Sequence, residues 1–203
     1  MNIFGSLKSL LVTLVLVQCV HAQSENESGP GPEQVVERLE QTLINIMRSP
    51  DDFEGRFETI EPVIKQSMAI ERMGRYLFGR DWRSIEDSDR ERFTETFLDL
   101  SAATYAGQFD EYNGEQFEAV ETQRQSEDRA LVRRRLITGS GKKIAFDYLM
   151  TRSDTGWKIV TIITDGVSDL AIKRTQYRRI LADNGFDAVI ARIRESIESQ
   201  RSD

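Results

Sequence analysis

Two apolar runs in the second half of the chain flank a short polar turn. Residues 143–152 and 157–163 are rich in β-branched and aromatic side chains, and Ser153-Asp154-Thr155-Gly156 separates them. This order predicts an antiparallel β-hairpin. If Arg152 pairs with Trp157, one face of the hairpin carries Phe146, Tyr148, Met150, Trp157, Ile159 and Ile163. Ordinary core packing is the default for each of these residues taken singly, but the whole face is apolar enough to wall a lipid pocket.

Two further strands are predicted before the hairpin. Residues 116–125 are polar, as expected for an edge strand. Glu127-Asp128 turns the chain into a strand over residues 130–138, and Gly139-Ser140-Gly141 leads from there into the hairpin. The pattern therefore predicts a four-stranded antiparallel meander.

Apolar residues at spacings of three to five predict helices on both sides of the strands. The most amphipathic of these helices follows Ser84, which we expect to cap it, and ends at Asn113-Gly114. We expect this helix to lie across the sheet with its apolar stripe of Phe93, Phe97, Leu100, Tyr105 and Phe109. Shorter helices are predicted over residues 33–48, 51–60, 63–78, 170–181 and 186–196, with Pro62 in an early turn or at a break. The order describes an α+β domain with helices packed on one face of a curved sheet.

Three consecutive arginines lie in the second predicted strand. Neighbouring side chains of a strand point to opposite faces, so Arg134 shares the apolar face of Val132 and Leu136, whereas Arg133 and Arg135 point away. A buried, unpaired guanidinium is too unfavourable to persist. Arg134 must therefore meet a carboxylate, reach the rim of the sheet, or bind a ligand anion such as a phosphate head group.

The N-terminus has the features of a secretory signal peptide. Lys8 precedes an apolar run at residues 10–17, and Val20-His21-Ala22 fits a cleavage site before Gln23. We therefore divide the chain into a signal peptide at 1–22, a flexible Gly/Pro-rich leader at 23–32 and a single domain at 33–203. Leu16-Val17-Gln18-Cys19 resembles a lipoprotein cleavage box only superficially, because Gln18 is a poor residue directly before the cysteine. The mature protein is expected to be exported and soluble.

The composition limits the kinds of catalytic and metal site that the mature chain can form. Cys19 and His21 are the only cysteine and histidine, and both precede the predicted cleavage site. The remaining chain can build no Ser-His-Asp or Cys-His catalytic site, and no Cys/His zinc site. No cofactor motif is present, and a net charge of −7 argues against nucleic acid. Carboxylate, lysine or tyrosine chemistry and a hard-metal site remain open to the mature chain, but no carboxylate pair has a spacing that demands catalysis and no metal loop is present. We expect a non-enzymatic protein without metal or cofactor.

Two stretches of the chain resemble a known family. The first is R-Y-L-F-G-R-D-W-R-S from Arg75, followed by R-F-T-E-T-F-L-D-L-S-A-A-T-Y-A from Arg92. The second contains G-W-K-I-V-T-I-I-T-D-G-V-S from Gly156 and N-G-F-D-A from Asn184. Over about residues 35–196 the sequence resembles MlaC, the phospholipid carrier family of the Mla pathway, also called the toluene-tolerance auxiliary family. Thr161 and Arg134 depart from the residues that the family often has at these positions.

The resemblance implies a periplasmic protein that holds phospholipid tails between helices and a sheet. It implies shuttling of phospholipid between an outer-membrane lipoprotein complex and an inner-membrane ABC-transporter complex, which maintains outer-membrane asymmetry and solvent tolerance. We expect a monomer. The candidate pocket residues are Phe97, Tyr105, Val132, Leu136, Phe146, Tyr148, Met150, Ile159 and Ile163, with Arg134 as the head-group candidate. A carrier for another lipid class such as hopanoids, or a small α+β enzyme, remains an alternative.

Overall fold

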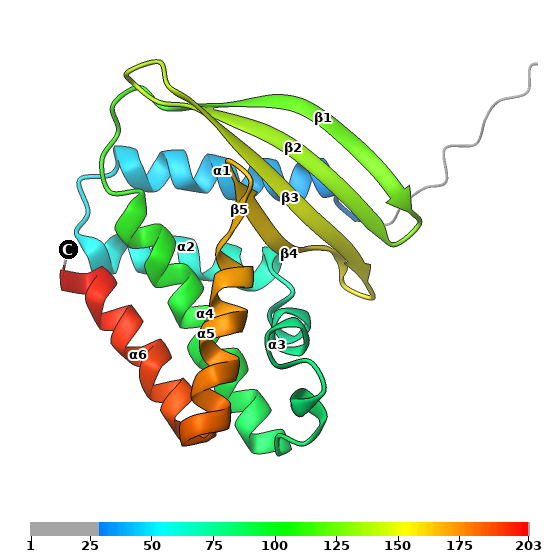
Figure 1. Ribbon diagram of the computed structural model, residues 1–203. Helices are drawn as coiled ribbons and strands as arrows, with labels where there is room; N and C mark the ends of the chain where they lie inside the picture. Colours follow the sequence, from blue (N-terminus) through cyan, green and yellow to red (C-terminus); the bar gives the residue numbers. More distant parts are fainter. Residues whose placement is uncertain (1–28, 203) are drawn as a thin grey trace, which may run out of the picture.

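The computed structural model describes residues 29–202, so the predicted signal peptide and most of the leader lie outside the described residues. Within this range the chain forms six α-helices, a short 3₁₀ helix and one five-stranded antiparallel sheet (Figure 1). The expected α+β class is confirmed. No helix of residues 29–202 has both the length and the apolar character that a membrane span requires. The elements are α1 (Pro32–Arg48), α2 (Phe53–Ser67), α3 (Ile70–Phe78), η1 (Asp81–Arg83), α4 (Asp87–Gln108), β1 (Gln116–Ser126), β2 (Arg129–Ile137), β3 (Lys143–Ser153), β4 (Gly156–Thr164), β5 (Val167–Ser168), α5 (Asp169–Asn184) and α6 (Phe186–Ser202).

The strands form a meander in the order β1-β2-β3-β4-β5. The fifth strand, which the sequence pattern did not predict, is made by a two-residue turn at Asp165-Gly166. Both residues have positive φ, 47° and 83°, as a tight hairpin turn requires. Asp165 also accepts a hydrogen bond from the backbone N–H of Ala145 through its carboxylate, at 2.8 Å. The turn sends the chain back toward the helices, so that α5 starts directly beside β4.

The β3–β4 register changes part-way along the hairpin. Met150 lies opposite Ile159, as predicted, but Leu149 lies opposite Thr161, so Val160 is an extra residue in β4. A bulge of this kind reverses the faces of all later side chains. The predicted register is therefore wrong beyond Ile159, where the chain segment between α2 and α3 also bonds to β4, with Ala69 N–H donating to the Ile159 carbonyl.

Helix α1, and not α4, lies directly against the sheet (Figure 1). The expectation that α4 is the most amphipathic helix is also wrong, because α1 and α3 separate apolar from polar residues more sharply. Val36, Leu39 and Leu43 of α1 are completely buried there. Helix α4 packs mainly against α2 and α6, further from the strands. The prediction that α4 lies across the sheet is therefore wrong in its detail, because its stripe of apolar residues serves both the helix bundle and a cavity described below.

Two predicted helix boundaries are also wrong. Helix α2 runs through Pro62. Proline has no backbone N–H, so one hydrogen bond within the helix is lost, but the ring faces solvent and the helix does not break. The break comes at Met68-Ala69. Ser84 is not the cap of α4, because that helix begins at Asp87 and Ser84 ends the preceding 3₁₀ turn.

An aromatic cluster holds α3 and α4 together at the end of the molecule away from the sheet. Trp82 stacks on Phe78, and Phe93 meets both rings edge-on at 5.1 and 5.5 Å. Gly74 gives the indole its space, because a Cβ there would lie 2.6 Å from the ring. Within the L-F-G-R-D-W-R motif, Phe78 and Trp82 therefore have a packing role.

Candidate functional site

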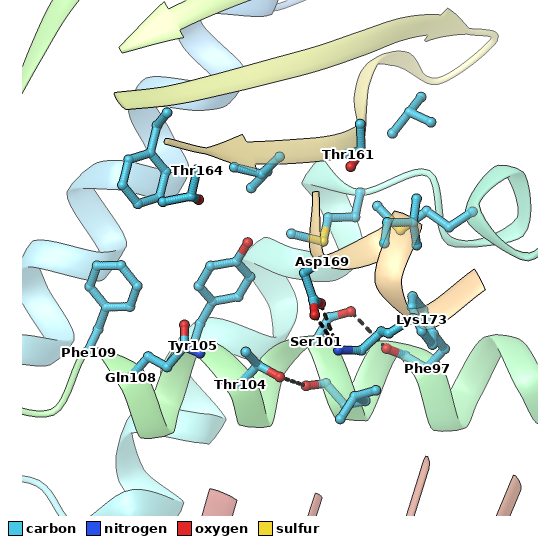
Figure 2. Close-up of a pocket in the computed structure, with 17 residues that line it drawn as sticks. Phe97, Ser101, Thr104, Tyr105, Gln108, Phe109, Thr161, Thr164, Asp169 and Lys173 are labelled. Atoms are coloured by element: carbon cyan, nitrogen blue, oxygen red, sulfur yellow. Dashed lines mark hydrogen bonds and ion pairs between the residues drawn. The ribbon is translucent and has the colours of Figure 1, made fainter. Parts of the chain in front are cut away.

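A cavity of about 230 Å³ separates α4 and α5 from the inner face of the sheet (Figure 2). Its walls come from four places: the α2–α3 link and α3, one face of α4, strands β3 and β4, and the first turn of α5. The lining residues are Met68, Met73, Phe97, Leu100, Ser101, Thr104, Tyr105, Gln108, Phe109, Phe146, Val160, Thr161, Ile162, Thr164, Asp169, Leu170 and Lys173. Most of the lining is apolar, and the charged pair lies at one side.

Three of the predicted pocket residues line this cavity. Phe97 and Tyr105 lie on its α4 wall, and Phe146 lies on its sheet wall. Six others do not. Of these, Val132, Tyr148, Met150 and Ile159 are at most 3% exposed and belong to the solid core. They share a face with Phe146, but α1 and the α2–α3 link cover that part of the face and leave no space.

The remaining two predicted residues also lie outside this cavity. Leu136 is buried in the same core beside its neighbours on β1 and β3. Ile163 lies opposite Asp147, on the face of the sheet away from the helices. The bulge at Val160 is the cause, since it gives the inner face to Ile162 and Thr164 instead.

The sequence pattern could have identified the α4 wall of the cavity, but it could not have identified the β4 wall. Leu100, Ser101, Thr104 and Gln108 follow Phe97 at helical spacings, so the stripe that predicted the helix also marks its cavity side. No such signal marks Val160 as an extra residue. The α5 wall depends on the tight turn at Asp165-Gly166, which sets the position of Asp169 and Lys173.

The hydroxyl groups of the α4 wall are already bonded within the helix. Ser101 donates to the Phe97 carbonyl at 2.8 Å, and Thr104 donates to the Leu100 carbonyl at 2.7 Å. This local bonding satisfies the two donors without any ligand. The wall can therefore lie against hydrocarbon without leaving these groups unpaired.

Tyr105 extends its phenol across the cavity toward the sheet (Figure 2). Burial raises the pKa of this phenol, and the negative charge of Asp169 raises it further. The hydroxyl is therefore neutral at any physiological pH. It is a polar group that does not ionise, inside a largely apolar space.

Asp169 and Lys173 form an ion pair at the side of the cavity. The Lys173 ammonium lies 2.7 and 2.9 Å from the two carboxylate oxygens of Asp169, one helical turn away on α5. Ser168 caps this helix by accepting from the Ala171 N–H, and its hydroxyl lies 3.1 Å from that of Thr161 on β4. These contacts fix the first turn of α5 against the sheet.

Arg134 is not at this cavity. Its guanidinium pairs with Glu40 of α1, with Nη2 2.7 Å and Nε 2.9 Å from one carboxylate oxygen. The Tyr148 hydroxyl also donates to Glu40, at 3.3 Å. Of the alternatives left open by the sequence, the structure shows the internal ion pair, and the guanidinium is occupied.

Residues 29–202 contain no group of three or more His, Cys, Asp and Glu side chains placed to hold a metal ion. The Asp169–Lys173 pair is accompanied by no third acid or base among the cavity residues. What the described arrangement offers is an apolar volume with one charged side, which suits the binding of an amphiphile.

The comparisons with known proteins agree with this geometry. The family model described as "MlaC protein" matches residues 34–195, which is most of the chain. The chain belongs to the MlaC protein family. No curated protein matches the sequence.

A solved structure provides a comparison in three dimensions. It is the phospholipid-binding protein from Ralstonia solanacearum in complex with a phospholipid, with a TM-score of 0.74 and 17% sequence identity. The alignment covers 84% of this chain and 99% of that chain. At this identity the match shows that the two proteins share a fold.

Proposed function

We propose that this protein is a periplasmic phospholipid carrier that holds acyl tails in the cavity between α4, α5 and the sheet. The observation that carries the proposal is the cavity itself, an apolar space kept open between a helix bundle and a sheet in a chain of the MlaC family. A core of this size has no structural need for such a space, because protein interiors are otherwise close-packed.

The energetics suit a carrier. Burying one methylene is worth about 0.8 kcal/mol, so two chains of roughly 30 carbons together gain on the order of 25 kcal/mol relative to water. A bilayer offers the same tails a similar gain. Exchange between protein and membrane is therefore close to balanced, and the carrier needs no chemical step of its own.

The size of the cavity adds a requirement. Ordinary small-molecule pockets have volumes of about 300–1,000 Å³, and the present cavity of about 230 Å³ lies below that range. Two acyl tails need more space. Loading therefore requires α4 and α5 to separate further from β4, and the Thr161–Ser168 contact lies where that separation would occur.

A carrier role also accounts for the absence of catalytic residues after the predicted cleavage site. The chain has no histidine or cysteine beyond His21, so the cavity can contain no serine–histidine or cysteine–histidine pair. We therefore propose a non-enzymatic role. By family membership we also propose that the carrier moves phospholipid between an outer-membrane lipoprotein complex and an inner-membrane transporter complex.

Native mass spectrometry of the full-length protein, expressed with its own signal sequence and purified from the periplasm, tests the proposal. We expect a bound mass equal to that of a diacyl phospholipid. The variant Ser101→Phe fills the α4 wall and should carry much less lipid. Thr94→Phe is the matched control, because Thr94 has the same hydroxyl bond within α4 but lies away from the cavity. A bound polycyclic lipid would favour the hopanoid alternative, and an empty wild-type protein would refute the proposal.

A further inference from the structure

A second cavity adjoins the first on the side away from the sheet. It has a volume of about 380 Å³ and lies between α4, α5 and α6. Five residues line both cavities and mark the boundary at which a passage between them would lie: Leu100, Thr104, Gln108, Asp169 and Lys173. Beyond the passage the lining is polar and charged, with Arg192, Glu195, Ser196, Ser199 and Gln200 of α6.

The change of lining matches the shape of an amphiphile. An apolar cavity continues into a polar one through a passage that carries both a cation and an anion. A phospholipid with its tails between α4 and the sheet would direct its head group through this passage. The other strong candidate for the head group, Arg134, already pairs with Glu40 and does not line either cavity.

The ion pair in the passage differs from an ordinary surface pair. Its members are one helical turn apart, which is a common stabilising arrangement on exposed helices. Here, however, the Lys173 side chain is only 20% exposed, whereas Asp169 is 70% exposed. Figure 2 shows the Lys173 ammonium turned inward beside the α4 wall. The cation is thus placed at the depth where a phosphate following the tails would arrive.

We propose that the second cavity is a head-group site selective for phospholipids that carry an ammonium group. The phosphodiester binds Lys173, with Arg192 further out, and the ammonium binds Asp169, with Glu195 further out. The inference rests on the proposed function, because it assumes that tails occupy the first cavity.

The selectivity follows from charge balance. When a zwitterionic head group enters, the phosphate replaces Asp169 as the partner of Lys173, and the ammonium replaces Lys173 as the partner of Asp169. Every charge keeps an opposite partner. An anionic head group such as that of phosphatidylglycerol supplies the phosphate alone, which leaves the Asp169 carboxylate without its cation and beside a second negative charge.

The test loads the purified, delipidated mature chain from vesicles that contain equal amounts of phosphatidylethanolamine and phosphatidylglycerol. Bound lipid is extracted and both species are quantified by mass spectrometry. Wild type should be enriched in phosphatidylethanolamine by at least about threefold. Asp169→Asn should remove the enrichment but keep the lipid. Lys173→Gln should lower the retention of both lipids by about tenfold, and Lys173→Arg should restore it.

The controls are Glu71→Gln and Arg75→Gln, which break an exposed pair with the same spacing on α3, outside both cavities. Circular dichroism confirms that each variant is folded. If wild type takes up the two lipids in equal amounts, or if the Asp169 and Lys173 variants behave like the controls, the head-group site is refuted and the carrier function stands. If wild type takes up no lipid, both proposals fall.

Discussion

Arg134 of β2 and Glu40 of α1 form a buried ion pair, with 2.7 Å between Nη2 and the carboxylate and side-chain exposures of 11% and 3%. The two residues are 94 positions apart in the chain. Their pairing ties α1 to the sheet, and Arg134 lies opposite Phe146 of the cavity wall on the neighbouring strand without lining the cavity itself. It explains how a strand can carry an arginine on its apolar face.

Breaking this pair should destabilise the protein without affecting lipid. Arg134→Leu leaves Glu40 buried and without its cation, and we expect a loss of about 3–5 kcal/mol in the free energy of unfolding. The double variant Glu40→Leu/Arg134→Leu should recover most of that loss, except for about 1 kcal/mol from the Tyr148 hydroxyl that loses its acceptor. Urea denaturation measures both. If the folded Arg134→Leu protein loses lipid while the double variant does not regain stability, Arg134 binds the head group after all.

The same pair predicts a dependence of stability on pH. Burial raises the pKa of Glu40 to about 7, and the hydrogen bonds from Arg134 and Tyr148 only partly oppose the effect. Between about pH 4.5 and pH 7 the folded state holds a proton at Glu40 that the unfolded state has released. The stability from this group is therefore complete below pH 4.5 and is lost as the pH rises through 7, by about 3 kcal/mol in all.

Comparison with Glu40→Gln isolates this contribution from those of other groups. The amide cannot titrate, so the difference in unfolding free energy between wild type and the variant should fall from pH 4.5 to pH 7 and be flat above pH 8. A difference that is constant with pH would show that Glu40 has an ordinary pKa, and one that rises with pH would show that its pKa is lowered; either result would contradict this prediction.

Much of the fold could be predicted from alternation and spacing, since the four main strands and most helices lie within a few residues of their predicted positions. The failures have local physical causes. Val160 is an extra residue in β4, and an extra residue leaves no mark in the pattern of apolar positions. Because of this bulge, Ile163 lies on the outer face of the sheet and not on the predicted inner face. Ile162 and Thr164, which were not predicted as pocket residues, line the cavity instead.

The candidate site was harder to predict for a related reason. Alternation shows which face of a strand is apolar, but it does not show which part of that face a helix covers. Tyr148 and Ile159 lie under α1 and the α2–α3 link, whereas Phe146 faces a cavity. The sequence correctly predicted that Arg134 lies on the apolar face of the sheet and needs a partner there. It could not predict that the partner is Glu40, because this depends on where α1 packs.

Two isoleucines of β4 should separate core from cavity. Ile159 is fully buried, so Ile159→Asp should lose more than about 4 kcal/mol and fail to fold. Ile162 lines the cavity, so Ile162→Asp should stay folded and lose its lipid, because the carboxylate can be hydrated in the space that tails would occupy. Circular dichroism and lipid extraction distinguish the two. Equal unfolding of both variants would mean that the cavity is part of a solid core.

The position of the acyl tails is the central claim, and photo-crosslinking tests it most directly. The protein is loaded with a phospholipid that carries a diazirine near the end of one acyl chain, irradiated, digested and mapped by mass spectrometry. We predict adducts on the cavity walls at residues such as Leu100, Tyr105, Phe109 and Ile162, and none in the polar pocket around Arg134 that Gln41, Ile44 and Phe117 line. Adducts concentrated at Ile44 and Phe117, with none on α4 or β4, would contradict the account.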